Sequence, residues 1–164
     1  MPETGPMLKG LEAIYSGRYD VFQPDDSPWD LRMEYHARDS AYILTRSLEM
    51  WSAEDHEYVY VYSGDVLDSG TLESRLESSM SDAMTRIVPG NGHRCSTVTT
   101  ILIYDSITVD AERSLKKHRS HRSFRLSLDG WVDGRVAALV NGNVTTDRLG
   151  KNLRTILEQL QSCF

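Results

Sequence analysis

The residues best suited to chemistry in this 164-residue sequence form a basic run at positions 113–125. The run holds two of the five histidines and six cationic side chains, which are Arg113, Lys116, Lys117, Arg119, Arg122 and Arg125. Such a cluster can neutralise phosphates and release their counterions, so it predicts binding of nucleic acid or another anion. The alternative is a solvated segment that pairs with the acidic first half of the chain, either within one subunit or between subunits.

Three glutamates upstream of this run are candidate metal ligands: Glu49, Glu54 and Glu57. Carboxylates can hold a divalent ion that activates water, which makes a metal-dependent hydrolase one hypothesis. Activation of water at such an ion would need a further basic residue, because no lysine lies between Lys9 and Lys116. The glutamates alone therefore do not complete a metal site.

No other motif completes an active site. The serines lack the Gly-x-Ser-x-Gly pattern, and the glycine-rich turn at residues 89–93 lacks a phosphate-loop pattern. Alternation along its strand turns His36 toward solvent, and His56 lies at a strand entrance without a fixed third ligand. The sequence therefore predicts no catalytic residue and no cofactor.

Charge is distributed unevenly along the chain. The net charge is −6, but residues 1–82 contain 17 acidic and 6 basic residues, whereas residues 83–164 contain 7 and 12. This asymmetry is typical of a basic face for an anionic partner, or of two halves that attract each other within or between subunits. No apolar stretch approaches the ~18 residues of a membrane span, and the N-terminus lacks a secretory signal. We therefore expect a cytoplasmic protein without a membrane partner.

Hydrophobic periodicity predicts one α+β domain over residues 1–164, in the order α-βββ-α-β-(α)-βββ-α. We expect a mixed or antiparallel sheet of about six strands with packed helices. Residues 1–6 are expected to be disordered, and residues 23–30 to form an acidic, proline-containing loop. The predicted helices cover residues 7–19, 71–88, 110–118 and 149–160, and the predicted strands cover residues 31–38, 41–46, 57–63, 97–104, 123–128, 131–140 and 144–146.

Three tyrosines on one predicted strand share a face. Side chains alternate along a strand, so Tyr58, Tyr60 and Tyr62 lie opposite Val59 and Val61. The tyrosine face is expected either under the protein's own helices or in a contact between subunits, where a buried ring with a wet hydroxyl is favourable. Together with the unequal charge of the two halves, it favours self-association.

Two runs, residues 42–62 and 124–135, resemble segments of small bacterial proteins of unknown function. The resemblance extends over most of the chain and implies a bacterial cytosolic origin, but no activity. The leading order α-βββ-α-β is similar to that of the restriction-endonuclease-like core, whose third strand carries a Glu-x-Lys motif. Here Glu57-Tyr58-Val59 has valine at the lysine position, which implies a degenerate, binding-only relative rather than an active nuclease.

These features predict a non-catalytic cytosolic binding or interaction protein, whose partner is another protein or a second copy of the chain. The first alternative is a nucleic-acid-binding protein that uses residues 113–125 on a degenerate nuclease-like fold. The second alternative is a metal-dependent hydrolase at the three glutamates.

Overall fold

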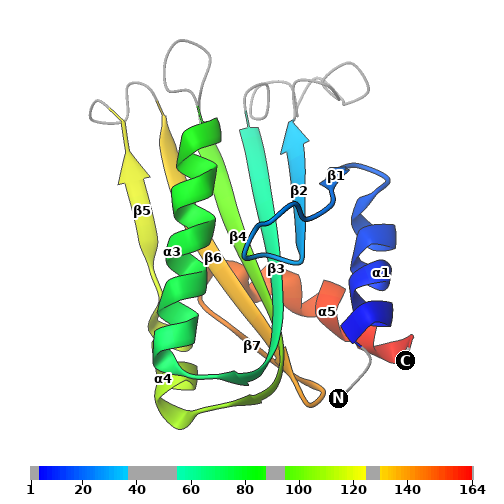
Figure 1. Ribbon diagram of the computed structural model, residues 1–164. Helices are drawn as coiled ribbons and strands as arrows, with labels where there is room; N and C mark the ends of the chain where they lie inside the picture. Colours follow the sequence, from blue (N-terminus) through cyan, green and yellow to red (C-terminus); the bar gives the residue numbers. More distant parts are fainter. Residues whose placement is uncertain (1–3, 37–54, 88–94, 125–129, 164) are drawn as a thin grey trace.

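The computed structural model describes residues 4–36, 55–87, 95–124 and 130–163, which form one mixed sheet of seven strands flanked by helices (Figure 1). The strand order is β1-β2-β3-β4-β6-β5, and β7 also pairs with β6. The strands are β1 (Asp20–Phe22), β2 (Leu31–His36), β3 (Asp55–Leu67), β4 (Cys95–Ile107), β5 (Ser120–Ser123), β6 (Trp131–Val140) and β7 (Asn143–Thr146). The helices are α1 (Thr4–Tyr15), α3 (Ser69–Arg86), α4 (Val109–Lys117) and α5 (Leu153–Ser162), the last preceded by the 3-10 turn η2 (Leu149–Asn152). The predicted α+β class is confirmed.

The centre of the sheet is parallel and its margins are antiparallel. β3, β4 and β6 run in the same direction, and α3 is the crossover from β3 to β4. The other strand pairs are all antiparallel. In Figure 1, α3 crosses one face of the sheet, while α1 and α5 lie against the other. A helix on each face explains why the central strands are long and rich in apolar residues.

The tyrosines of β3 lie under α3. Tyr58, Tyr60 and Tyr62 are at most 3% exposed and belong to the same buried cluster as Leu72 of α3. The Tyr62 hydroxyl lies 2.9 Å from the Ser79 hydroxyl on that helix. Their shared face is therefore confirmed, and it is covered by the protein's own helix rather than left for a second subunit.

Helix α1 begins earlier than predicted, and a short strand follows it. Residues 4–6 are helical rather than disordered, because Pro6 falls in the first turn, where a missing backbone N–H is not costly. The three-residue strand β1 was not predicted. It exists because Val21 pairs with Met33 of β2, which is a contact between distant residues.

Most of the predicted strand at residues 123–128 lies outside the described residues. The described part of this region holds β5, which was not predicted at these positions and pairs residues 120–123 with β6, with Ser120 opposite Gly134. A Cβ at position 134 would lie 2.9 Å from the Ser120 Cβ, so glycine allows this close approach. Residues 125–129 lie outside the described residues, as does the predicted strand at 41–46.

β5 and β7 occupy the same edge of β6, one after the other. β5 pairs with residues 131–134 of β6, and β7 pairs with residues 137–140. Between the two paired stretches, the backbone N–H of Asp147 donates to the Val136 carbonyl at 3.2 Å. The end of β7 therefore comes close to the start of β5.

Candidate anion-binding edge and adjoining groove

The basic run lies at the surface, on α4 and β5 at one edge of the sheet (Figure 1). The side chains that are exposed are Arg113, Lys116, Lys117, Arg119 and Arg122, and Arg125 lies outside the described residues. α4 is well formed, because Thr108 caps its first turn through a hydrogen bond from the Ala111 N–H at 3.2 Å. Its last turn carries two lysines, which are favourable at the negative end of the helix dipole.

The ion pairs of this segment are local. Lys116 pairs with Glu112 in the same helix at 3.5 Å. Two histidines contact aspartates of the second half of the chain, as described below. Among the described residues, no carboxylate pairs with Arg119 or Arg122, and the acidic half of the chain supplies no ion pair to the segment. The predicted alternative, in which the acidic half of the same chain matches the charges of the segment, is therefore not seen in these residues.

His118 and Asp147 form a buried pair at the junction of β5 and β7. Nδ1 of His118 lies 2.7 Å from Oδ2 of Asp147, and the two side chains are 16% and 1% exposed. The other oxygen, Oδ1, accepts the Gly150 N–H at 2.7 Å. A Cβ at position 150 would lie 2.5 Å from the Val136 carbonyl oxygen and 2.7 Å from Oδ1, so glycine is needed for this fit.

A pocket of about 310 Å³ lies beside this junction. It is lined by His118, Arg119, Ser120, His121, Asp133, Arg148 and Leu149. The exposed His121 hydrogen-bonds to Asp133, with Nδ1 2.6 Å from Oδ1. The pocket thus brings Arg148, which follows β7, next to Arg119 of the basic run. We name the six exposed cations of this region the basic edge: Arg113, Lys116, Lys117, Arg119, Arg122 and Arg148.

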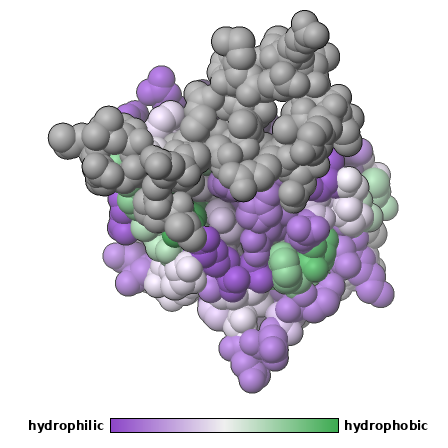
Figure 2. Space-filling view, turned by 90° about the horizontal axis from the view of Figure 1, so that it is seen from above, coloured by the Kyte–Doolittle hydropathy of each residue, from purple (hydrophilic) through white to green (hydrophobic). Residues whose placement is uncertain are grey.

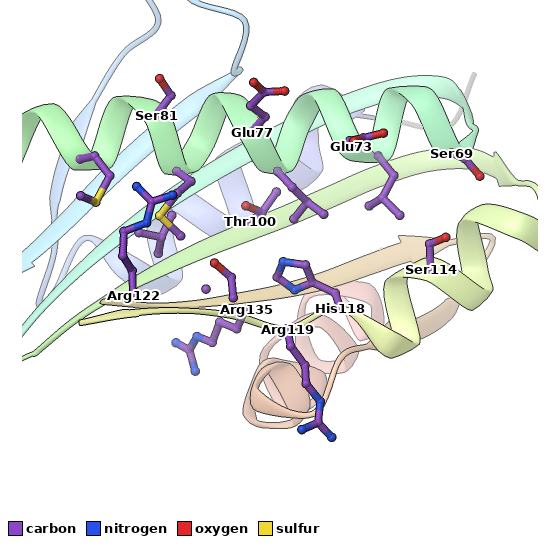
Figure 3. A pocket seen from close by; sticks show the side chains of 17 residues that line it. Ser69, Glu73, Glu77, Ser81, Thr100, Ser114, His118, Arg119, Arg122 and Arg135 are labelled. Atoms are coloured by element: carbon purple, nitrogen blue, oxygen red, sulfur yellow. The ribbon is translucent and has the colours of Figure 1, made fainter. Parts of the chain in front are cut away.

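A larger groove of about 900 Å³ runs between α3 and the α4–β5 segment (Figure 3). Its helix wall carries Leu76, Met80 and Met84, which are only partly buried, together with exposed Glu73 and Glu77. On the opposite wall, the imidazole of His118 points into the groove and Arg122 extends toward α3, while Arg119 and Arg135 turn away (Figure 3). The groove therefore joins an apolar helix face to one end of the basic edge.

One family model matches residues 4–159, and its description is "Domain of unknown function (DUF8052)". The chain belongs to this family. No curated protein and no solved structure matches the chain. Membership of DUF8052 supports the expectation of an uncharacterised family, and it leaves the function to be inferred from the site itself.

In this DUF8052 chain, the candidate metal ligand Glu57 is engaged by protein groups. Oε2 accepts hydrogen bonds from the Thr99 hydroxyl and from the Arg135 guanidinium, both at 2.6 Å, and Oε1 accepts from the Tyr19 hydroxyl. Arg135 also donates to the Thr99 hydroxyl at 2.8 Å. Burial alone would lower the pKa of Arg135, but the facing Glu57 carboxylate outweighs it and raises that pKa. The other two candidates, Glu49 and Glu54, lie outside the described residues.

Two further histidines of the described residues contact each other, one on β2 and one on β3. The register places His36 directly opposite His56, and their Nδ1 atoms are 2.7 Å apart. Nε2 of His36 lies 3.1 Å from Glu34. The sequence does not predict this contact, because no short turn connects the two strands to set their register. Among the described residues, no group of three His, Cys, Asp or Glu side chains could hold a metal ion.

The described helices do not meet the requirements of a membrane span. None of them, within the described ranges, combines the length and the apolar character that crossing a bilayer requires. Seen from above, the surface that is not grey is largely hydrophilic and shows apolar side chains in separate patches (Figure 2).

Proposed function

We propose that this protein binds nucleic acid through the phosphates, using the basic edge. The observation that carries the proposal is the exposure of these cations, of which Lys116 alone has a carboxylate partner among the described residues. Exposed cations without carboxylate partners can replace the counterions condensed on a phosphate backbone, and the release of those counterions drives binding.

The distribution of charge favours a polyanion over a small ion. The cations extend along α4, through β5 and on to Arg148, so they cover an extended surface rather than one point. The protein as a whole carries a net charge of −6, so an anionic partner is attracted to this edge and repelled elsewhere. This makes the proposed contact local and orientation-specific.

An apolar protein partner has less support from the surface. The large apolar side chains that are exposed in the described residues are spread over five elements and are Ile14, Phe22, Val66, Val109 and Leu149. Side chains scattered in this way do not mark an interface. Pairing of two copies through the edges of their β5 strands would bring like charges together, which is unfavourable.

The scaffold is compatible with a nucleic-acid-binding relative of the nuclease-like core. β1 to β4 are consecutive in the sheet, and the element order is α-βββ-α-β. Val59 stands at the lysine position of the nuclease motif, and Arg135 lies against Glu57 instead. These residues favour binding without metal-dependent cleavage at Glu57. We place the activity in the cytoplasm of a bacterial cell, in line with the resemblance of residues 42–62 and 124–135.

The test is fluorescence anisotropy with labelled single-stranded RNA and duplex DNA between about 50 and 200 mM salt. The double variant Arg119→Gln/Arg122→Gln removes two cations of the basic edge. The matched control, Lys9→Gln/Arg18→Gln, removes two exposed cations near α1, so both variants have the same net charge. For duplex DNA, we expect the first variant to reduce the slope of log K against log salt by about 0.9 for each phosphate that the protein no longer neutralises.

Three outcomes are distinguishable. Weaker binding and a smaller slope in the first double variant alone would support the basic edge as the binding surface. An equal loss of affinity in both double variants would mean that only the total charge of the protein matters, and the proposal would be wrong. No binding at the lowest salt would also refute it, and sedimentation of the protein alone would then test whether the edge pairs with an acidic surface of a second copy.

A further inference from the structure

We propose that the groove between α3 and β5 cleaves RNA, with His118 as the general base that takes the proton of a ribose 2′-hydroxyl. This inference depends on the proposed binding of nucleic acid at the basic edge. It adds an activity, a substrate class and a catalytic residue to that binding surface.

The first support is the construction of the His118–Asp147 pair. The carboxylate is 1% exposed, and each of its oxygens accepts a hydrogen bond at 2.7 Å, from Gly150 or from His118. An ionised carboxylate can only accept, so Nδ1 of His118 carries the hydrogen. In the neutral ring the lone pair is then on Nε2, and the ring orientation is fixed by the pair. This is the state that a general base requires.

The second support is where Nε2 lies. Nδ1 is occupied by Asp147, and no described residue hydrogen-bonds to Nε2. The ring lines both the groove and the smaller pocket of the basic edge, and in Figure 3 it points into the groove. A buried carboxylate therefore orients a histidine whose second nitrogen is available to a bound molecule.

The third support is the charge of the two walls. On the β5 side, Arg122 shares the groove with His118 and can hold a phosphate there. On the α3 side, Glu73 and Glu77 repel phosphate, so a bound strand is directed toward His118. Between them, Leu76, Met80 and Met84 offer partly exposed apolar surface on which a base can lie.

The reaction needs no co-reactant. The 2′-hydroxyl loses its proton to Nε2 of His118, and the 2′-oxygen forms a bond to the adjacent phosphorus. The bond from phosphorus to the 5′-oxygen breaks, and its electron pair leaves with that oxygen. The imidazolium returns its proton through water to the 5′-oxygen, so the products are a 2′,3′-cyclic phosphate and a 5′-hydroxyl. Atoms and charge balance, and Arg122 stabilises the charge that develops on the phosphate oxygens.

The alternative role of the pair is structural, because it joins the ends of β5 and β7 on the edge of β6. A structural role predicts loss of stability in His118 variants without effect on chemistry. Two measurements distinguish the catalytic role from the structural one, because a change in stability alone does not affect them. They are the pH dependence of the cleavage rate and the rescue of that rate by added imidazole. The other charged groups that line the groove and the pocket are Glu73, Glu77, Arg119, His121, Arg122, Asp133, Arg135 and Arg148.

The experiment is single-turnover cleavage of an end-labelled, mixed-sequence single-stranded RNA, with protein in excess. The same sequence as 2′-deoxy oligonucleotide measures binding without cleavage. We expect His118→Ala to lower the rate constant by about 10²–10⁴-fold and imidazole to restore part of it in His118→Gly. Asp147→Asn should reduce the rate and alter its pH profile. The control His36→Ala, on β2, should keep the rate of the unmodified protein.

The outcomes separate the two proposals. Binding of the deoxy strand with no cleavage of RNA would overturn the catalytic inference and leave the binding function standing. Cleavage at an equal rate in His118→Ala would also overturn it, since the activity would come from elsewhere. Absence of binding to either strand would refute the proposed function and this inference with it. Cyclic-phosphate products, their loss in His118→Ala and rescue by imidazole would establish the inference.

Discussion

Replacement of Arg135 by methionine tests whether the Arg135–Glu57 pair is a desolvated structural pair. The two side chains are only 17% and 12% exposed, and they meet at 2.6 Å. Methionine keeps much of the aliphatic length but leaves the Glu57 carboxylate with two neutral donors, the hydroxyls of Tyr19 and Thr99. Breaking a buried pair from one side costs about 3–5 kcal/mol because a charge remains buried without its partner.

We expect the lower end of that range, about 3 kcal/mol, because both side chains retain some exposure and Glu57 keeps two hydrogen bonds. For a chain of this length, that corresponds to a fall in Tm of about 6–12 °C. The double variant Arg135→Met/Glu57→Gln removes the buried charge as well. The double variant should therefore lose about 1–2 kcal/mol less of the free energy of unfolding than Arg135→Met and Glu57→Gln lose in sum.

The assay is urea unfolding of the four proteins in this double-mutant cycle, followed by circular dichroism. Lys116→Met is the control, because its pair with Glu112 is a helical i,i+4 contact whose side chains are 60% and 41% exposed. Such pairs contribute about 0.3–0.5 kcal/mol. The assignment of a buried, coupled pair is wrong if Arg135→Met lowers the free energy of unfolding no more than Lys116→Met does. It is also wrong if the effects of the substitutions at Arg135 and Glu57 are additive.

Three further predictions concern the tyrosines. Tyr15→Phe should leave the free energy of unfolding unchanged or raise it by up to about 1 kcal/mol in urea unfolding, because its buried hydroxyl has no hydrogen-bond partner among the described residues. A clear loss of stability would mean that the hydroxyl is bonded. Burial opposes ionisation of Asp82, but hydrogen bonds from Arg86 and Tyr60 outweigh it and hold its pKa below the usual range. This contact stabilises the fold at pH values above the pKa that Asp82 has in the unfolded chain. The stabilisation is lost as the pH falls through the lower pKa that Asp82 has in the folded protein. Tyr60→Phe should therefore cost about 1–2 kcal/mol at neutral pH and less in acid, whereas Tyr62→Phe should show no such pH dependence. Burial raises the pKa of Tyr62 to about 12, and the folded state therefore keeps a proton that the unfolded state loses above pH ~10. Stability should be full below that pH and decline above it. The tyrosinate absorbance should then rise together with the loss of the circular dichroism signal. Ionisation of Tyr62 in the folded protein near pH 10 would contradict its burial. The same direction holds for Tyr15, Tyr19, Tyr58 and Tyr60.

Elements with a strong local pattern were predictable from the sequence. The apolar stripe of α3 predicts residues 71–88, and the helix covers Ser69–Arg86. β6 has the predicted bounds, because its apolar run ends at the Asn141-Gly142 turn, where both residues have positive φ. In contrast, β1 and β5 are three and four residues long and depend on their partner strands. Such strands carry little signal of their own, and the predicted strand at residues 123–128 overlaps β5 only at Ser123.

The cations of the candidate site were predictable and their partners were not. Six basic residues within thirteen positions stand out in any composition window, whatever the fold. Asp147 is 29 residues from His118, and Arg148 belongs to a turn that gives no sign of binding. Their positions depend on which strand edge β7 occupies, and that is a property of the sheet rather than of the local sequence.

The shared edge of β6 explains why fold and site are coupled in this protein. A single strand long enough to cover β6 would satisfy its backbone without leaving a junction. Two short strands, β5 and β7, instead meet between residues 134 and 137, where backbone groups need other partners. Asp147 supplies one, through its N–H to the Val136 carbonyl, and the same residue then orients His118. The carboxylate that completes the sheet edge is thus the one that fixes the histidine beside the exposed cations.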